Sequence, residues 1–162
     1  MLGSDYDGQN CSIARTLEVV GERWSLLVIR DAFLGVRRFD DFQRSLGLSR
    51  NVLAARLTRL VELGVLTKVA YSERPARYEY RLTDRGRDLL PVILTLADWG
   101  DRHAPNPAGP PRVFLHRDCG GHVDARHMRC EACGADIDSP RQITAPPGPG
   151  AKSAPVPLTA AE

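Results

Sequence analysis

The stretch that decides the fold runs from Ser49 to Leu63, SRNVLAARLTRLVEL, and Gly64 closes it. Its apolar residues recur at i, i+4, i+7 and i+8, which predicts a helix buried on the face of Leu53, Leu57, Leu60 and Val61. Ser49 can cap this helix, because its hydroxyl can accept an unpaired backbone N–H. Gly64 supplies the left-handed residue with which many helices end.

The opposite face of this helix is small, hydrogen-bonding and cationic. It carries Arg50, Asn51, Ala54, Ala55, Thr58 and Arg59, with Glu62 at its far end. Small side chains let a helix approach a surface closely, and Arg and Asn can pair with guanine and adenine edges. Taken alone, the same face is equally typical of an amphipathic helix whose outer side is solvated. The neighbouring segments have to distinguish these two interpretations.

Three helical patterns precede this stretch, over residues 11–20, 23–34 and 39–45. The third is joined to the Ser49 helix by a tight turn at Gly47-Leu48. Two short helices connected by a glycine-containing turn are typical of a helix-turn-helix.

The period changes after Gly64. Residues 66–71 and 77–82 alternate and are rich in β-formers, and residues 72–76 between them resemble a turn, so this region predicts a β-hairpin. A hairpin directly after a helix-turn-helix is the order expected of a winged helix, whose wing can contact DNA backbone or a minor groove. Arg74 and Arg77 lie at the tip and flank of the wing, with Lys68 behind them.

A last helical region covers residues 83–103, with Thr83 as its N-cap. Pro91 inside the pattern predicts a kink or two abutting helices. The second half, Pro91 to Trp99, is apolar over most of its circumference, more than one monomer face can bury. We therefore expect a homodimer that uses this helix, with the first helix as a second contributor.

Composition limits the class of protein. The chain has 162 residues, enough for one hydrophobic core and an appendage. Its net charge of +2 gives it no strongly basic character. The basic surplus is local, because residues 37–81 hold ten Lys or Arg against five acids. No stretch is long and apolar enough to span a membrane and no signal segment opens the chain, so we expect a cytoplasmic protein. Its four cysteines are then more typical of thiols or metal ligands than of disulfides.

These patterns predict a mainly α protein with a β-hairpin wing and a small C-terminal zinc-ribbon-like module. The expected divisions are a flexible segment (1–10), a winged-helix DNA-binding and dimerisation domain (11–104) and a Pro-rich linker (105–111). A metal-binding module (112–138) and a disordered tail rich in Pro, Gly, Ala and Ser (139–162) complete the chain.

The first two-thirds of the chain resemble HxlR-type winged helix-turn-helix transcriptional regulators, relatives of the MarR group. The resemblance rests on a cysteine near the start, then GERW (21–24), GVRRFDDF (35–42), the Ser-led helix and YEYRLT (78–83), all in this order. It implies a dimeric DNA-binding regulator that responds to small molecules or redox stress. By the family pattern, Ser49, Arg50, Asn51, Ala54 and Arg59 face the DNA groove.

Four further arginines, Arg37, Arg38, Arg74 and Arg77, are candidates for phosphate or minor-groove contacts. The alternative for each is a solvated arginine, or one paired with a carboxylate at Asp40, Asp41 or Glu79.

The C-terminal module carries two ligand pairs of equal spacing. His116 and Cys119 form one pair, Cys130 and Cys133 form the other, and ten residues separate them. Two such pairs can converge on one tetrahedral zinc ion, and a closed site with four protein ligands is structural. His122 and His127 are possible substitutes for His116. The alternatives are reduced thiols in a flexible segment, or a Cys130–Cys133 redox pair.

Cys11 stands alone near the start of the first helix, where a helix N-terminus and Arg15 favour the thiolate. The resemblance adds that some family members sense oxidants with a cysteine here, although a small side chain packed in the dimer is as compatible with the sequence.

We expect a homodimeric regulator on a pseudo-palindromic operator of double-stranded DNA, with half-site centres about 34–36 Å apart. An effector or oxidant would change the separation of the recognition helices. The alternative is a winged-helix and zinc-ribbon adaptor of the transcription machinery. An enzyme is not expected, because the only candidate couple, Cys130–Cys133, lacks a thioredoxin-like context. We expect an effector pocket between the dimer helices and the winged core, although no polar cluster in the sequence marks it.

Overall fold

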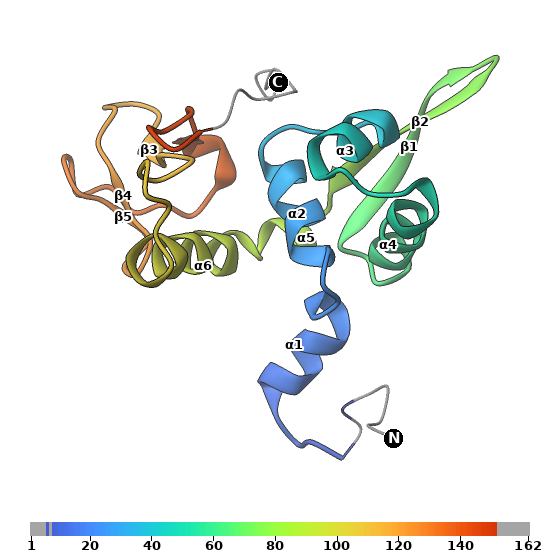
Figure 1. Ribbon diagram of the computed structural model, residues 1–162, viewed down its shortest axis with the longest axis horizontal. Coiled ribbons are helices and arrows are strands. Elements are labelled where there is room, and N and C mark those ends of the chain that lie inside the picture. The colour runs from blue at the N-terminus through green and yellow to red at the C-terminus, as the bar shows by residue number, and fades with distance from the viewer. Residues whose placement is uncertain (1–5, 7, 152–162) are drawn as a thin grey trace.

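The computed structural model describes residue 6 and residues 8–151. Figure 1 shows a helical body with a hairpin at one end and a small β module at the other. The helices are α1 (Ser12–Val20), α2 (Ser25–Phe33), α3 (Phe39–Leu46), α4 (Arg50–Glu62), α5 (Asp84–Arg87) and α6 (Leu90–His103). The strands are β1 (Leu66–Glu73), β2 (Ala76–Leu82), β3 (Leu115–His116), β4 (Val123–Asp124), β5 (Arg129–Cys130) and β6 (Ile143–Thr144), with a 3₁₀ turn at Pro140–Gln142.

Helix α4 forms as its sequence predicts. The Ser49 hydroxyl accepts the backbone N–H of Val52 at 3.4 Å, and Gly64 adopts the left-handed conformation with φ of 68°. Leu53, Leu57 and Leu60 have no exposed surface. One face of α4 is therefore fully buried, and the other is left for solvent or a ligand.

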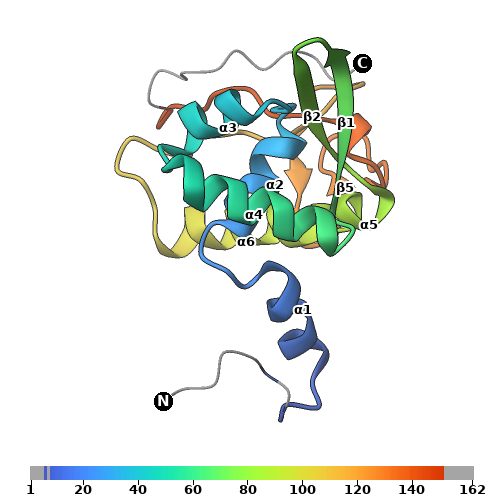
Figure 2. The same ribbon diagram turned by 90° about the vertical axis from the view of Figure 1, so that its right-hand side faces the viewer.

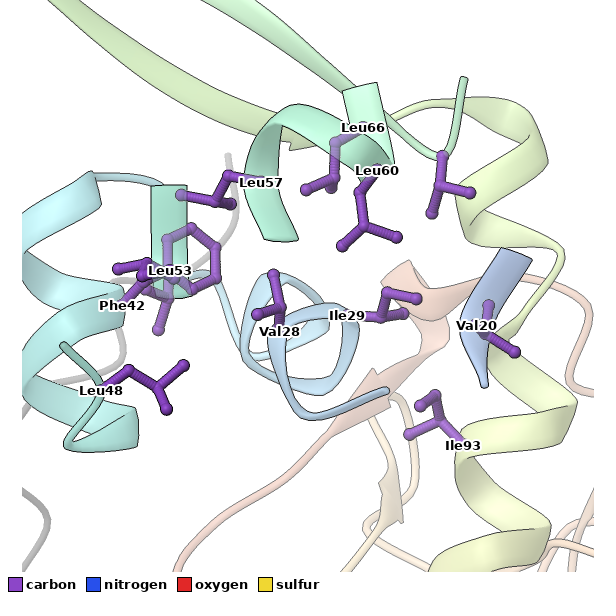
Figure 3. Close-up of a cluster of buried hydrophobic side chains, with 12 residues drawn as sticks. Val20, Val28, Ile29, Phe42, Leu48, Leu53, Leu57, Leu60, Leu66 and Ile93 are labelled. Carbon is purple, nitrogen blue, oxygen red and sulfur yellow. The ribbon is translucent and has the colours of Figure 1, made fainter. Parts of the chain in front are cut away.

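The core is built around α2. Val28 and Ile29 are fully buried, and Figure 3 shows them between the leucines of α4 on one side and Val20 and Ile93 on the other. Because α1, α2, α4 and α6 all contribute to one cluster, α4 and the expected dimer helices share a single core.

Helix α3 is held against both α4 and the hairpin. Gly47 ends α3 with φ of 64°, which turns the chain sharply into α4. Phe42 is fully buried and meets Tyr80 of β2 edge-on, with 6.5 Å between ring centroids. The helix-turn-helix and the wing are therefore packed as one unit, and the predicted winged helix is confirmed.

The hairpin is longer than its sequence pattern suggested. β1 and β2 pair from Leu66↔Leu82 out to Glu73↔Ala76, with an irregularity between Ala70 and Ser72. The turn predicted at residues 72–76 is too long. Ser72, Glu73 and Ala76 belong to the paired strands, so only Arg74 and Pro75 form the tip.

Two abutting helices, α5 and α6, form the region around Pro91. This is one of the two predicted arrangements, the other being a single kinked helix. Thr83 caps α5 by accepting the Gly86 N–H at 3.1 Å. Pro91 occupies the second position of α6, where its missing N–H has no helical partner to lose.

The C-terminal region differs from its predicted boundaries. Residues 139–151, expected to be disordered, include the 3₁₀ turn at Pro140–Gln142 and strand β6, and β6 pairs with β3. Gly148 N and Gly150 N donate to the carbonyls of Pro111 and Pro110 at 3.0 and 3.2 Å, so this segment also closes over the expected linker. The sequence did not predict this pairing, because isolated backbone hydrogen bonds do not require a periodic pattern of apolar residues.

The flexible segment predicted for the N-terminus and the rest of the disordered tail fall largely on residues 1–5, 7 and 152–162, which lie outside the described residues. In the described part of the chain, no helix combines the length and apolar character that crossing a membrane would need.

Leu57→Ala should lower the free energy of unfolding by roughly 2–5 kcal/mol, because it leaves a cavity in the shared core. Urea denaturation at a fixed protein concentration measures the change. Thr58→Ala, on the exposed face of the same helix, should change stability by no more than about 0.5 kcal/mol. Equal losses in the two variants would contradict the packing described for α4.

Candidate DNA-binding surface and metal centre

The predicted groove-facing side chains of α4 are all exposed. Ser49, Arg50, Asn51, Ala54 and Arg59 lie on the solvent side of the helix, opposite the buried leucines. Figure 2 looks onto this helix together with the β1–β2 hairpin, so the two present a common face. Val52 is also 40% exposed here, which the apolar pattern did not reveal because valine suggests burial.

Arg50 is held toward α3. Its Nη1 lies 3.2 Å from Asp40 Oδ1, and its guanidinium lies 4.8 Å from the centroid of the Phe39 ring. The side chains of Arg50 and Asp40 are 68% and 75% exposed, so water screens their ion pair and it contributes little. This ion pair uses one of the carboxylates considered above as partners for Arg37, Arg38, Arg74 and Arg77, although no such pairing was predicted for Arg50. It orients Arg50 without burying it, so the guanidinium remains available to an incoming base or phosphate.

Arg59, one of the two basic residues in the groove-facing set, lies near the end of α4. Its Nη1 is 3.6 Å from Glu62 Oε2, and both side chains are more than half exposed. Such a pair is weak in water and can exchange for a stronger anion.

Arg37 and Arg38 lie where the loop before α3 meets the wing. The backbone N–H of Tyr80 donates to the Arg37 carbonyl at 2.8 Å. The Arg38 guanidinium pairs with Glu79 at 3.8 Å and lies 4.8 Å from the centroid of the Tyr71 ring. These contacts fix two basic residues at the base of the wing, and the Arg38 side chain is paired there.

The wing itself is cationic and aromatic. Arg74 and Arg77 are exposed at and beside its tip, and neither has an ion-pair partner among the residues that the structure describes. The Lys68 ammonium lies 4.1 Å from the centroid of the Tyr78 ring. Tyr71 and Tyr78, each 42% exposed, were missed by sequence reasoning. The two-residue period of the strands gives no signal for Tyr78, because it sets this residue on the same face as the half-buried Tyr80.

A second surface is apolar. Val92, Leu96 and Trp99 follow one another at i, i+4 and i+7 on α6 and are 36%, 49% and 57% exposed. On α1, Ile13 is 71% exposed and Leu17 is 38% exposed. These five residues form what we call the apolar surface of α1 and α6, distinct from the groove-facing side of α4.

The four predicted metal ligands converge. Nδ1 of His116 lies 3.3 Å from Sγ of Cys119 and 3.3 Å from Sγ of Cys133, and Sγ of Cys119 lies 3.4 Å from Sγ of Cys130. All four donor atoms lie within 4.8 Å of one another. Three sulfurs and one imidazole nitrogen around one point are a donor set that suits Zn²⁺ in tetrahedral coordination.

Two similar turns build this cluster. After His116 and after Cys130 the chain turns back, with Gly120 N donating to His116 O at 2.8 Å and Gly134 N donating to Cys130 O at 2.9 Å. Both glycines have positive φ, 71° and 72°, a conformation that other residues rarely adopt. The glycine that follows each ligand pair in the sequence therefore has a structural cause.

Backbone N–H groups favour thiolate at one ligand. The Cys133 and Ala132 amides lower the pKa of Cys130 to about 6, outweighing the effect of burial. At Cys119 the Gly121 amide lowers the pKa, but the neighbouring Cys130 and Cys133 and desolvation together raise it above its ordinary value. The crowding of three thiols around one point is relieved when a cation binds their thiolates.

The two other histidines of the module lie outside the cluster. The His127 ring is 2.5 Å from Asp124 Oδ2, at the turn between β4 and β5, and His122 is exposed. Of the three candidate histidines, only His116 is brought to the sulfurs, and it is 4% exposed.

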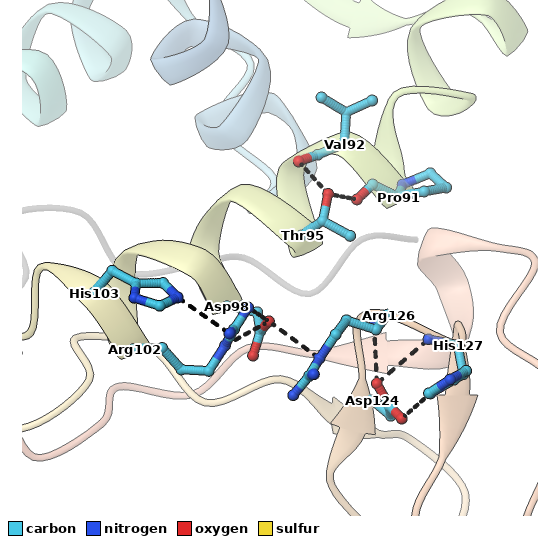
Figure 4. A network of polar contacts seen from close by, with 9 residues as sticks. All are labelled: Pro91, Val92, Thr95, Asp98, Arg102, His103, Asp124, Arg126 and His127. Carbon is cyan, nitrogen blue, oxygen red and sulfur yellow. Dashed lines mark hydrogen bonds and ion pairs between the residues drawn. The ribbon is translucent and has the colours of Figure 1, made fainter.

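The module docks on the outer part of α6. Arg126 Nε lies 3.7 Å from Asp98 Oδ2, which also binds Arg102 at 2.7 Å (Figure 4). Figure 1 shows the module at the opposite end of the molecule from α4 and the hairpin. The module therefore contacts the expected dimer helix and lies away from the cationic face.

Residues 19–107 match the model of the family described as HxlR-like helix-turn-helix. The chain belongs to this family. The match covers α2 to α6 and the hairpin, and it ends before the metal cluster.

Relatives of this HxlR-like chain bear the names of regulators. It is 49% identical over 152 residues, 94% of each chain, to an uncharacterized HTH-type transcriptional regulator of Mycobacterium tuberculosis (strain CDC 1551 / Oshkosh). It is 33% identical over 106 residues to the HTH-type transcriptional regulator YdeP of Bacillus subtilis (strain 168), covering 63% of this chain and 83% of YdeP. The first similarity extends over the C-terminal module.

Solved structures agree with the fold. The crystal structure of PA1607 is 43% identical, with a TM-score of 0.67 over 75% of this chain and 85% of that one. The redox regulator HypR in its oxidized form is 30% identical, with a TM-score of 0.54 over 57% of this chain and 97% of that one. The protein is thus a transcriptional regulator of the HxlR and MarR-like type, and the prediction that it is not an enzyme is confirmed.

Cys11, the predicted redox residue of this HxlR-like chain, is exposed at the N-cap of α1. Arg15, expected to assist the thiolate, donates to the Ser12 hydroxyl at 2.9 Å. A sensing role for Cys11 stays a prediction.

The purified protein should carry close to one zinc per chain, and Cys133→Ser should abolish stoichiometric binding because it removes one of four ligands. Elemental analysis by mass spectrometry measures the metal content. His127→Ala is the matched control and should retain zinc, because its imidazole lies outside the cluster. Equal loss in both variants, or a wild-type chain without zinc, would contradict the assignment of these ligands.

Proposed function

We propose that the chain is a cytoplasmic homodimeric regulator that binds a pseudo-palindromic operator in double-stranded DNA. The observation that carries this proposal is the exposed, small and cationic face of α4 beside a wing that exposes Arg74 and Arg77. An α-helix fits the major groove, and a two-fold dimer would set two such helices one helical turn apart.

The two sets of basic residues have different tasks in this proposal. Arg50, Asn51 and Arg59 read base edges, with Ser49 and Ala54 close to the groove. Arg37, Arg38, Arg74 and Arg77 bind phosphates or the minor groove and fix the register. The weak, exposed ion pairs of Arg50 and Arg59 favour this, since each cation can leave a solvated carboxylate for a phosphate or base. Arg38 lies 3.8 Å from Glu79, which Arg81 also holds at 3.0 Å, so Glu79 keeps a cationic partner if Arg38 binds a phosphate.

The apolar surface of α1 and α6 is the proposed dimer contact. A row of Val92, Leu96 and Trp99 on a single helix is costly to leave in water, and a second copy would cover it. Each subunit would present the same patch, as a two-fold interface requires.

Zinc bound by His116, Cys119, Cys130 and Cys133 is proposed to be structural. Four protein ligands close the site, and the short strands of the module bury little apolar surface, so the metal would supply folding energy. The signal to which the regulator responds is proposed to be a small molecule or an oxidant acting at Cys11.

Selection of genomic fragments by the purified protein, sequenced after binding at two salt concentrations, tests this function. We expect a two-fold related motif that persists at the higher salt. Sequence-blind binding that collapses with salt would contradict it and favour an adaptor of the transcription machinery.

Arg50→Ala and Arg74→Ala should differ in kind. Losing Arg50 should relax base preference at one position in each half-site by about 1–3 kcal/mol. Losing Arg74 should weaken binding to all sequences alike and reduce the slope of log affinity against log salt concentration by about 1. Binding to a panel of single-base operator variants at several salt concentrations separates these effects, and identical profiles for the two variants would refute the division of tasks.

Trp99→Asp should raise the dimer dissociation constant by at least about 30-fold, since it sets a charge in the centre of the proposed apolar contact. Sedimentation velocity over a concentration series measures the constant. Val69→Asp, on the wing and 39% exposed, is the matched control and should leave the dimer intact. A Trp99→Asp protein that remains dimeric would exclude this surface as the interface.

A further inference from the structure

Val52 is an exposed apolar side chain on the outer side of α4. It is 40% exposed, whereas its neighbour Leu53 has no exposed surface. Among the residues that the structure describes, the other exposed side chains of α4 are polar, charged or alanine. Neither the core nor the hydrogen-bonding roles proposed for Arg50, Asn51 and Arg59 uses this valine.

Val52 lies in the first turn of α4. Its backbone N–H donates to the Ser49 hydroxyl at 3.4 Å, which makes it the third residue of the helix. In a helix-turn-helix, the N-terminal residues of the second helix are those that reach the base edges. The helical period places Ala55 and Arg59 on the same side as Val52, and both are exposed. Because the side chain one turn further on is only a methyl group, a surface that approaches this side of α4 meets Val52.

Helix stability does not account for a valine at this position. Its branched side chain loses rotamer freedom in a helix. A glutamate or glutamine here would complete a capping box with Ser49, and an acid would also suit the helix dipole. Instead, α4 has no acidic residue in its first turn. An acid there would be repelled by the phosphates of DNA, so an uncharged residue suits a polyanionic ligand better.

The chemistry of valine selects one base. In the major groove, every base pair presents hydrogen-bond donors and acceptors, and thymine alone adds an apolar group, its C5-methyl. Valine has no side-chain donor or acceptor. Over the polar edge of another base it would displace water without replacing the lost hydrogen bonds. Over the thymine methyl it would instead remove apolar surface from water.

We infer that Val52 is a specificity-determining residue that selects thymine at one position in each half-site by packing against the C5-methyl group. The inference rests on the proposed function, because it requires that α4 lies in the major groove of an operator. It adds an apolar contact to the hydrogen bonds proposed for Arg50, Asn51 and Arg59, and it fixes the identity of a base that none of those three side chains reads.

A scan of the operator with deoxyuridine tests this contact. In the motif from the genomic selection, each thymine is replaced in turn by deoxyuridine, which removes the methyl group and keeps the base pair. At the position read by Val52, we expect the affinity of the full-length protein to fall about fourfold for one half-site and about 15-fold when both are substituted. Fluorescence anisotropy at a fixed salt concentration measures the affinity.

Val52→Ala identifies which thymine is concerned. At that position the variant should bind the thymine and deoxyuridine operators with the same affinity, within about twofold. The side chain is exposed and alanine favours a helix, so the fold should be retained. Val69→Ala, on the wing and with 39% exposure of the valine, is the matched control and should keep the full preference for thymine.

A methyl group on a different base gives a second readout. When the T·A pair at this position is replaced by C·G, the wild-type protein should bind an operator with 5-methylcytosine there about fourfold more tightly per half-site than one with cytosine. The Val52→Ala variant should not distinguish the two.

Three results would overturn the inference. These are a motif without thymine in its half-site, a wild-type protein that is indifferent to deoxyuridine at every thymine, and a Val52→Ala variant that keeps each thymine preference. In all three cases a motif exists, so the proposed function stands. If the selection finds no motif at all, the proposed function fails and the role of Val52 fails with it.

Discussion

The contact between α4 and α2 is the constraint on which the rest of the structure depends. Leu53, Leu57 and Leu60 lose all exposed surface against a core that contains Val28 and Ile29. Because this face is buried, the opposite face of α4 is exposed to solvent. The same core also holds α1 and α6 through Val20 and Ile93. A displacement of these expected dimer helices therefore changes the packing against α4, the helix proposed to read DNA.

Charge and apolar surface lie on different parts of the molecule. The exposed arginines gather on α4, the loop before α3 and the wing, and the carboxylates paired with Arg50 and Arg59 are themselves solvated and hold them weakly. The apolar row of Val92, Leu96 and Trp99 lies on α6, which runs from the core toward the C-terminal module at the other end of the molecule (Figure 1). This division supports a molecule that meets a polyanion with one end and a second copy of itself with another surface.

The C-terminal module illustrates how a short segment can be ordered without a large core. Its strands contain two residues each, and its order comes from the His116, Cys119, Cys130 and Cys133 cluster and from backbone pairings that run back to the Pro-rich segment. The ion pair between Arg126 and Asp98 joins it to α6. A metal there would stabilise a structure that touches the proposed dimer helix, which gives the appendage a connection to assembly.

The sequence by itself determined the elements whose cause is local. The 3.6-residue period located α4, Ser49 and Gly64 marked its ends, alternation located the hairpin, and two pairs of equal spacing identified four side chains that converge on one point. The tertiary structure alone decided which histidine joins the sulfurs, that Arg50 and Arg38 lean on Asp40 and Glu79, and that residues 139–151 close back on the linker. It also decided that Arg15 and Arg85, seventy positions apart in sequence, line one cavity. The physical reason is that periodicity and capping act between residues a few positions apart, whereas partners distant in the chain are chosen by how the whole core packs.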